Sequence, residues 1–299
     1  MDEPASPGPL TLALGYAVRS DVGLLREGNE DSAYAGPHLL AVADGMGGHA
    51  AGELASAATI TTIAPLDAEE PGPDLVGALA GAVAAASLRL QELIISDPAI
   101  EGMGTTLTAL LWSEGYAALC HIGDSRAYLL RDGQFVQITR DHTLVQSLVE
   151  EGTITEDDVA AHPYRSLLLR ALDGRAIAEP DLIPLETYPG DRYLLCSDGL
   201  SGVVSERTLH QVLAYVRDLD EVTSRLVGLA IEGGGPTTSR ASWPMSSTRA
   251  AAGCRPPGSP CSPARRPAAH RLTCPVGRAE FPGDQGRAAE PDRPAARDA

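Results

Sequence analysis

Two short segments of the chain each run from an apolar stretch into an aspartate that is followed by a glycine. Asp44 and Gly45 lie in LLAVADGMGG, and Asp198 and Gly199 lie in YLLCSDGLSG. Hard divalent cations prefer carboxylate oxygens on a rigid support, and glycine lets the backbone turn sharply and bring a carbonyl oxygen near an ion. The two Asp-Gly segments therefore predict a shared metal site if they meet at one edge of a sheet.

Charged residues elsewhere in the chain suit a phosphate ester as the substrate of such a site. Glu30 and Asp31 follow Arg26 within five residues in REGNEDS, and Asp124 follows a strand-like run in CHIGDSRAY. Metal ions can hold a nucleophilic water and the phosphoryl oxygens, and an arginine can bind a phosphate through two parallel hydrogen bonds. The pattern indicates metal-assisted hydrolysis of a phosphate ester.

Several of these residues also have a structural interpretation. Asp124 could be a turn residue bonded to its own loop, and Arg26 could pair with Glu30. An isolated Asp-Gly pair is more often a turn than a ligand. We therefore expect turns at Asp132-Gly133 and Asp173-Gly174, and structural roles for His49 and His121.

The apolar patterning predicts an α+β chain in which blocks of strands are separated by pairs of helices. We expect helices over residues 50–66, 74–96, 143–151, 205–216 and 219–232, and strands over 10–23, 38–44, 103–139 and 192–198. Asp132-Gly133 predicts a tight hairpin, and Thr155 is expected to cap a further short helix.

Composition and charge narrow the choice of partners. The chain has 299 residues and a net charge of −17, which argues against nucleic acid or an anionic membrane as the main partner. Cys120 and Cys196 lie in apolar runs and are expected to be buried thiols, with no disulfide framework. We recognise no signal peptide and no apolar run long enough to span a bilayer, so we expect a cytoplasmic monomer.

Five motifs, in order, resemble those of a known family. REGNEDS, VADGMGGHAAGE, GMGTTL, HIGDSRAYLLRDG and LLCSDGLS look like the metal-dependent protein phosphatases (PPM, type 2C), above all the bacterial Ser/Thr phosphatases that oppose receptor-like kinases. The resemblance covers roughly residues 12–236. It implies a four-layer α-β-β-α sandwich of two antiparallel sheets flanked by helices. It also implies phosphorylated proteins as substrates and a Ser/Thr kinase as a functional partner.

The resemblance assigns the metal ligands. Asp44 would bridge two Mn²⁺ or Mg²⁺ ions, Gly45 would give its carbonyl oxygen to one of them, and Asp198 would be a further ligand. Asp124 would match a ligand of a third, weaker ion. A water or hydroxide that bridges the ions would attack phosphoserine or phosphothreonine directly, without a phosphoenzyme.

The resemblance also assigns residues around the ions. Arg26 would bind the substrate phosphate, whereas Glu30 and Asp31 would act through metal-bound waters. Met46 stands where some eukaryotic members carry a histidine proposed as the general acid, so the donor of the leaving-group proton is left unassigned. Residues 143–180 fall where the family has a flap beside the site, which implies a role in substrate choice.

The chain departs from the family pattern after Pro236. The pattern continues from GGGP into Asp-Asn and a β-branched strand, and that aspartate is a metal ligand, but this chain has Thr237 and then TSRASWPMS. One restored G before codons such as ACA ACA TCA CGT GCA TCG TGG CCG ATG TC changes the reading to Asp-Asn-Ile-Thr-Cys-Ile-Val-Ala-Asp-Val. Our hypothesis is a single lost base.

The composition of the last segment agrees with a change of reading frame. Residues 1–236 hold 13 Arg and 35 acidic residues, whereas residues 237–299 hold 10 Arg and 5 acidic residues. We expect a flexible leader over 1–10, a phosphatase domain over 11–236 without its final strand, and a disordered tail over 237–299. The alternative function is a catalytically impaired pseudophosphatase that binds phosphoproteins without turnover.

Overall fold

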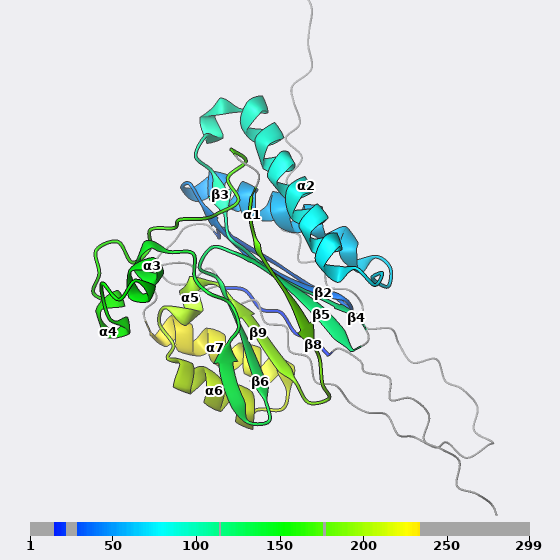
Figure 1. Cartoon of the computed structure of the whole chain (residues 1–299), viewed down its shortest axis with the longest axis vertical. Helices are drawn as coiled ribbons and strands as arrows, with labels where there is room; N and C mark the ends of the chain where they lie inside the picture. The colour runs from blue at the N-terminus through cyan, green and yellow to red at the C-terminus, as the bar shows by residue number, and fades with distance from the viewer. Residues whose placement is uncertain (1–14, 22–28, 114, 176–177, 234–299) are drawn as a thin grey trace, which may run out of the picture. The chain divides into compact units, whose positions relative to one another are not determined.

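The computed structural model describes residues 15–21, 29–113, 115–175 and 178–233 (Figure 1). The strands are β1 (Asp31–Ala35), β2 (Leu39–Met46), β3 (Gly104–Thr105), β4 (Leu107–Ser113), β5 (Tyr116–Ile122), β6 (Arg126–Arg131), β7 (Gln134–Gln137), β8 (Asp181–Glu186) and β9 (Arg192–Cys196). The helices are α1 (His49–Ile63), α2 (Leu75–Ser96), α3 (Leu144–Glu150), α4 (Glu156–Val159), α5 (Asp198–Ser201), α6 (Glu206–Tyr215) and α7 (Leu219–Glu232), with short 3₁₀ turns at Ala64–Asp67 and Pro98–Ile100.

The strands form two antiparallel sheets. The larger sheet has the order β1-β2-β4-β5-β8, with β3 paired to β2, and the smaller sheet has the order β7-β6-β9. Figure 1 shows α1 and α2 beside the larger sheet, and α6 and α7 beside the smaller one.

Three buried clusters separate four layers. On β2, Leu39 and Ala41 face the cluster under α1 and α2, whereas Leu40 and Val42 face the cluster between the sheets. The same alternation on the smaller sheet sends β9 residues such as Leu194 toward α6 and α7. Alternation on every central strand means that both faces of each sheet are covered. The predicted α-β-β-α sandwich is confirmed.

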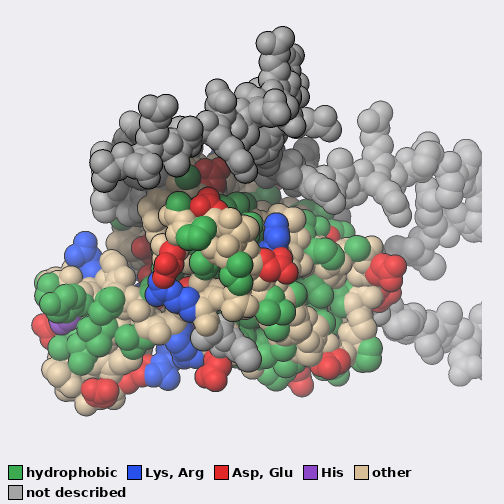
Figure 2. All heavy atoms as spheres, turned by 90° about the horizontal axis from the view of Figure 1, so that it is seen from above, with side chains coloured by type: hydrophobic (Ala, Val, Ile, Leu, Met, Phe, Trp, Pro, Cys, Tyr) green, Lys and Arg blue, Asp and Glu red, His purple; other side chains and the backbone are tan. Residues whose placement is uncertain are grey.

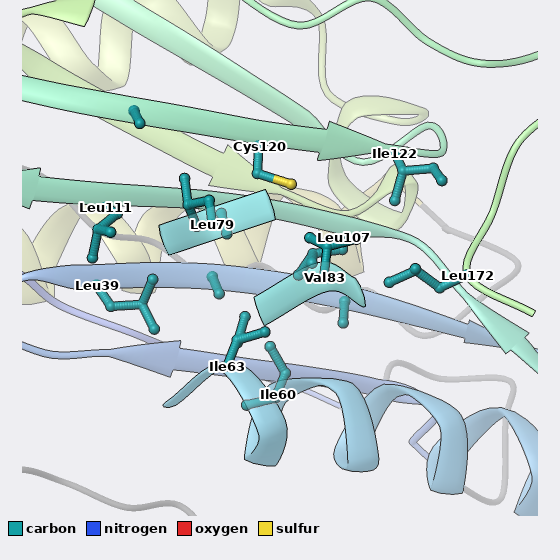
Figure 3. Close-up of a cluster of buried hydrophobic side chains, with 14 of the residues drawn as sticks. Leu39, Ile60, Ile63, Leu79, Val83, Leu107, Leu111, Cys120, Ile122 and Leu172 are labelled. Carbon is teal, nitrogen blue, oxygen red and sulfur yellow. The ribbon is translucent and has the colours of Figure 1, made fainter. Parts of the chain in front are cut away.

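The cluster under α1 and α2 is aliphatic, as the low aromatic content predicts. Figure 3 shows Ile60 and Ile63 of α1 and Leu79 and Val83 of α2 gathered over strand residues such as Leu107. Burial of each such side chain contributes about 1.5–3 kcal/mol relative to leaving it exposed. This packing fixes the larger sheet on which two of the candidate aspartates lie.

Helix α2 is long and apolar enough to cross a membrane by length and composition alone. An apolar composition is also expected of a helix that buries one of its sides in the domain. Leu75, Leu79, Val83, Ala86 and Leu90 are buried along one side of the helix. Asp74 caps its first turn by accepting a hydrogen bond of 2.8 Å from the backbone N–H of Gly77. In this structure, that side of α2 packs against α1 and the larger sheet.

Most of the predicted elements are present, but one predicted strand is wrong and three of the strands and α-helices were not predicted, the short helix α5 among them. The Asp132-Gly133 turn joins β6 to β7 with positive φ at both residues, as expected of a tight hairpin. Thr155 begins α4 with a capping box. Strands β1 and β8 were not predicted. The strand expected over 10–23 is wrong for its described part, because residues 15–21 form no strand.

Strand β8 was missed because Pro184 lies within it and lacks a backbone donor, which is tolerated at the edge of a sheet. Cys120 and Cys196 are free and buried, as predicted, and burial raises the pKa of each thiol to about 12. The leader and the tail over 237–299 lie outside the described residues.

Candidate metal and phosphate site

Asp44 lies near the end of β2, directly opposite Asp31 on β1. Residues paired in this way on adjacent antiparallel strands have Cβ atoms about 4.5–5.5 Å apart. Asp31 is buried, whereas Asp44 keeps part of its surface accessible. Two carboxyl groups are therefore held face to face by the register of the larger sheet.

Asp198 reaches the same place from the smaller sheet. It lies two residues beyond the end of β9 and begins α5. The preceding residue, Ser197, is fully buried and donates a hydrogen bond of 2.9 Å from its hydroxyl group to a carboxylate oxygen of Asp31. This bond joins the ends of the two sheets and brings Asp198 beside the Asp31–Asp44 pair.

Asp124 lies in the turn that links β5 of the larger sheet to β6 of the smaller one. Gly123 precedes it with φ of 112°, and a Cβ atom there would lie 2.6 Å from Cβ of Thr106. Both the conformation and the contact require glycine at this position. The turn thus packs against the segment that supports Asp44.

Electrostatics confirm that the four aspartates form one group. Burial, followed by repulsion from Asp31, Asp198 and Asp124, raises the pKa of Asp44 well above its ordinary value. Burial and the negative charge of Asp198 raise the pKa of Asp124 to about 8. Ionising Asp44 and Asp124 together is therefore costly unless a compensating positive charge is present.

Buried hydroxyl groups hold the backbone of Asp44. Thr106 Oγ1 accepts the Asp44 N–H at 3.0 Å, and Thr105 Oγ1 donates to the Asp44 carbonyl at 2.9 Å. Thr106 Oγ1 also lies 2.8 Å from Oγ of Ser125, the residue after Asp124. Since Thr106 accepts from a backbone N–H, its own proton is available for Ser125. One threonine thus links the supports of Asp44 and Asp124.

Gly45 and Glu30 lie together beside this group. The Gly45 N–H donates to the carbonyl oxygen of Glu30 at 3.1 Å. A Cβ on Gly52 would be 3.0 Å from both the Gly45 carbonyl oxygen and Oε2 of Glu30. A backbone carbonyl and a carboxylate therefore border one small space, where an ion or its water could bind.

The donor set fits hard divalent cations. Every candidate ligand is a carboxylate or carbonyl oxygen, and the raised pKa values reflect a place where negative charge accumulates. Within the described residues, no three His, Cys, Asp or Glu side chains are arranged to hold a metal ion, so the four aspartates are near neighbours that interact electrostatically and not a formed ion cage. The family pattern places only Asp44 and Asp198, among the described carboxylates, on the two main ions.

A cavity of about 230 Å³ opens beside Met46, two residues beyond Asp44. Arg170 and Arg175 line it from the segment that follows α4. Figure 2 shows hydrophobic side chains gathered over the part of the molecule that carries α3 and α4. The large hydrophobic residues that are exposed in this segment are Tyr164, Leu167 and Leu169.

The structure brings together most of the residues singled out in the sequence: Glu30, Asp31, Asp44, Gly45, Asp124 and Asp198. Arg26, Thr237 and the side chain of His49 lie outside the described residues. His121 is fully buried and hydrogen-bonded within the protein, as expected of a structural histidine. Asp173-Gly174 is a turn, in which Asp173 Oδ1 accepts the Arg175 N–H at 3.0 Å.

Sequence reasoning missed the polar residues that support the site, namely Thr105, Thr106, Ser125, His142 and Ser197. The signal available was a polar residue beside each motif aspartate, as in CSD and GDS. Neighbouring sequence alone does not show which hydroxyl group is buried.

Comparison with known proteins agrees with this geometry. A family model described as protein phosphatase 2C matches residues 29–228, which contain all six of the residues brought together at the site. The chain belongs to the protein phosphatase 2C family. The predicted resemblance is therefore confirmed.

Relatives within the family are bacterial protein phosphatases. The chain is 54% identical over 227 residues to the serine/threonine protein phosphatase PstP of Mycobacterium tuberculosis, an alignment that covers 76% of this chain but 44% of PstP. It is 34% identical over 232 residues to the serine/threonine phosphatase stp of Listeria innocua, covering 73% of this chain and 90% of that protein. The chain thus spans less than half the length of PstP.

A solved structure of the PstP catalytic domain in complex with two manganese ions is also similar. Its TM-score is 0.74 at 50% sequence identity, and the match covers 80% of this chain and 99% of that one. This similarity supports the two-sheet architecture of the protein phosphatase 2C fold described above.

Proposed function

We propose that this domain hydrolyses phosphoserine and phosphothreonine on proteins with the help of Mn²⁺ or Mg²⁺. One observation carries the proposal. Four aspartates from distant parts of the chain converge where the two sheets meet, in a member of the protein phosphatase 2C family. Asp44 and Asp124 have raised pKa values within this group, and such carboxyl groups are costly to the fold, which favours a functional site.

The main ions would be held by Asp44, Asp198 and the carbonyl oxygen of Gly45. Asp124 would hold a third, weaker ion. When bound, the cations would neutralise the phosphoryl oxygens and make a water molecule more acidic. PstP, whose catalytic domain binds two manganese ions, supports this choice of metal and number.

The other residues would position water and substrate. Glu30 and Asp31 would accept hydrogen bonds from water at the site, since each carboxylate lies against the ligand-bearing strand. Arg26 would bind the phosphate of the substrate through two hydrogen bonds. Residues of the cavity beside Met46 would contact the chain that flanks the phosphorylated residue.

Phosphoproteins would be the substrates, and a Ser/Thr kinase would supply them. PstP and stp, both named as serine/threonine phosphatases, support this substrate class. A monomeric state and a cytoplasmic location remain predictions.

The test is phosphate release from a phosphothreonine peptide by the full chain, with Mn²⁺ and after chelation. We expect release that depends on the added metal and that is lost in Asp44→Asn. Release that survives chelation, or that persists in Asp44→Asn, would contradict the proposal. Phosphotyrosine peptide serves as the matched substrate control, and we expect it to be hydrolysed more slowly.

A further inference from the structure

The turn that carries Asp124 is clamped at two points by one residue, His142. The His142 backbone N–H donates to the carbonyl oxygen of Gly123 at 2.7 Å. The Gly123 backbone N–H donates in return to Nδ1 of His142 at 3.1 Å. The Gly123 carbonyl belongs to the peptide unit that leads into Asp124, and the Gly123 N–H belongs to the unit before it. The backbone of His142 therefore holds the peptide next to Asp124, and its imidazole holds the preceding one.

These contacts determine the tautomer of His142. Because Nδ1 accepts a backbone N–H, the ring proton is on Nε2, which lies 3.1 Å from a carboxylate oxygen of Asp181 and donates to it. Arg170 donates to the other oxygen of Asp181 at 3.0 Å. The side chain of His142 is almost fully buried, and burial lowers its pKa. His142 is therefore a neutral bridge from Gly123 to Asp181.

His142 also stands where the segment containing α3 and α4 leaves and rejoins the domain. We call residues 143–169 the flap segment. The carbonyl oxygen of His142 accepts the backbone N–H of Leu169 at 2.8 Å. The next residue, Thr143, forms an isolated β-bridge with Leu168, and its hydroxyl caps α3. Both ends of the flap segment are thus anchored at or beside His142.

A neighbouring histidine, His121, shows what a purely structural role looks like. His121, whose ring centre is 4.8 Å from that of His142, is a buried histidine with both nitrogens satisfied, Nδ1 by Thr108 and Nε2 by the Arg140 carbonyl. His121 bonds to strand and loop groups, none of which is Asp124 or its neighbour Gly123. His142 differs because its acceptor nitrogen holds Gly123 while its carbonyl holds the flap segment.

We propose that His142 is a positioning residue that couples the flap segment to Asp124, with Nδ1 as the side-chain atom that holds Gly123 and, through it, the turn that carries Asp124. The inference rests on the proposed metal site. If His142 served packing alone, loss of either ring contact would have the same effect. Under the proposal the two contacts differ: Nδ1 holds the turn that carries Asp124, whereas Nε2 joins His142 to Asp181.

Two substitutions separate these atoms. In His142→Asn, the amide oxygen can take the place of Nδ1 and accept from Gly123, but the side chain is too short to reach Asp181. In His142→Gln, the amide nitrogen can take the place of Nε2 and donate to Asp181, but the Gly123 N–H loses its acceptor. The pair is matched in side-chain chemistry and differs in which contact is kept.

The measurements are Mn²⁺ titration by calorimetry and amide hydrogen exchange, both on the full chain. We expect His142→Gln to weaken the weakest Mn²⁺ site about 10-fold, in the range found when groups that support metal ligands are lost. It should also speed exchange in peptides that contain Gly123 and Leu169. His142→Asn should retain most of the metal affinity. In an Asp124→Asn background, His142→Gln should cause no further loss of Mn²⁺ affinity.

Equal effects of the two substitutions on Mn²⁺ binding, or a loss that persists in the Asp124→Asn background, would overturn the positioning role. Both variants are melted in parallel, so that general destabilisation is recognised as an equal shift in the two. If the unsubstituted chain binds no Mn²⁺, the proposed function itself fails, and the role of His142 fails with it. If it binds Mn²⁺ and His142→Gln binds equally well, only the role of His142 fails.

Discussion

The two sheets hold their carboxylates at the site in different ways. The larger sheet places Asp31 opposite Asp44 by strand register, and two threonines bind both backbone groups of Asp44. The smaller sheet has three strands among the described residues, and Asp198 follows β9, which lies at its edge. The Ser197 hydroxyl joins that end of β9 to Asp31.

The difference shows that the larger sheet fixes its ligand with redundant contacts, whereas the smaller sheet depends on fewer. Asp44 is held by a central strand with neighbours on both sides, and its backbone bonds are buried. Asp198 depends on the end of an edge strand, and the family pattern continues after Pro236 into a further metal ligand from which this chain departs. We therefore expect the larger sheet to determine whether metal binds at all, and the smaller sheet to determine how tightly.

Replacing each ligand by its amide is the strongest test of this comparison. Asp44→Asn removes a carboxylate from both proposed ions, so we expect Mn²⁺ affinity to fall by more than about 100-fold, beyond the loss typical of supporting groups. Asp198→Asn removes a ligand from one ion and should cost less. Calorimetric titration of both variants measures the two losses. A larger loss for Asp198→Asn would reverse the assigned roles.

Restoring the reading frame tests the metal ligand that the family pattern has directly after Pro236. A chain that continues from Pro236 as Asp-Asn-Ile-Thr-Cys-Ile-Val regains the carboxylate of the family pattern at position 237. We expect about 100-fold faster phosphate release than from the 299-residue chain, together with tighter Mn²⁺ binding. The control is the same restored chain with Asn at position 237. Equal rates for the 299-residue and restored chains would show that this carboxylate is not needed.

Sequence predicted the part of the site that depends on local pattern. Asp44, Asp124 and Asp198 each follow an apolar run, and that arrangement is recognisable without a structure. The direct pairing of Asp31 with Asp44 was not predictable from composition, since β1 reads DSAYA and shows no clear alternation. Its register is set by pairing with β2, which is a tertiary contact.

The residues that support the site could not be predicted from the sequence, for a related reason. Thr106 lies 62 residues from the Asp44 N–H that it accepts, and Ser197 lies 166 residues from Asp31. A serine or threonine in a sequence has no mark that distinguishes a buried partner from a surface residue. Only the fold shows which hydroxyl groups are enclosed and which donors they satisfy.

The stability of the metal-free protein should depend on pH through Asp124. Its pKa is raised to about 8 in the folded state, whereas an unfolded aspartate titrates near 3.9. Between these values the folded state binds more protons, so the free energy of unfolding should fall as pH rises from about 4 to about 8. Thermal melting after chelation measures this fall.

Two comparisons isolate the carboxylate cluster from other titrating groups. Asp124→Asn should reduce the fall in melting temperature with pH, because the amide does not titrate. Added Mn²⁺ should raise the melting temperature more at about pH 8 than at about pH 6, since fewer protons must be displaced. A pH dependence that is identical in Asp124→Asn would remove Asp124 as its cause.

The smallest expected effect compares the two hydroxyl supports. Thr106→Val leaves the Asp44 N–H and the Ser125 hydroxyl without their partner in a buried place, and should lower the free energy of unfolding by about 1–3 kcal/mol. Ser197→Ala removes one hydrogen bond to a carboxylate that has several polar neighbours, and should cost about 1 kcal/mol. Denaturant unfolding of the metal-free proteins measures both.

A matched control is available in α1. The hydroxyl of Thr59 is buried and has no hydrogen-bond partner within the described part of the chain, so Thr59→Val should be neutral or slightly stabilising. A cost for Thr59→Val equal to that for Thr106→Val would mean that any buried threonine is sensitive to loss of its hydroxyl. If only Thr106→Val lowers the free energy of unfolding, the loss is due to the hydrogen bonds of Thr106 with Asp44 and Ser125. That result would agree with the proposal that the larger sheet supports Asp44 through several contacts.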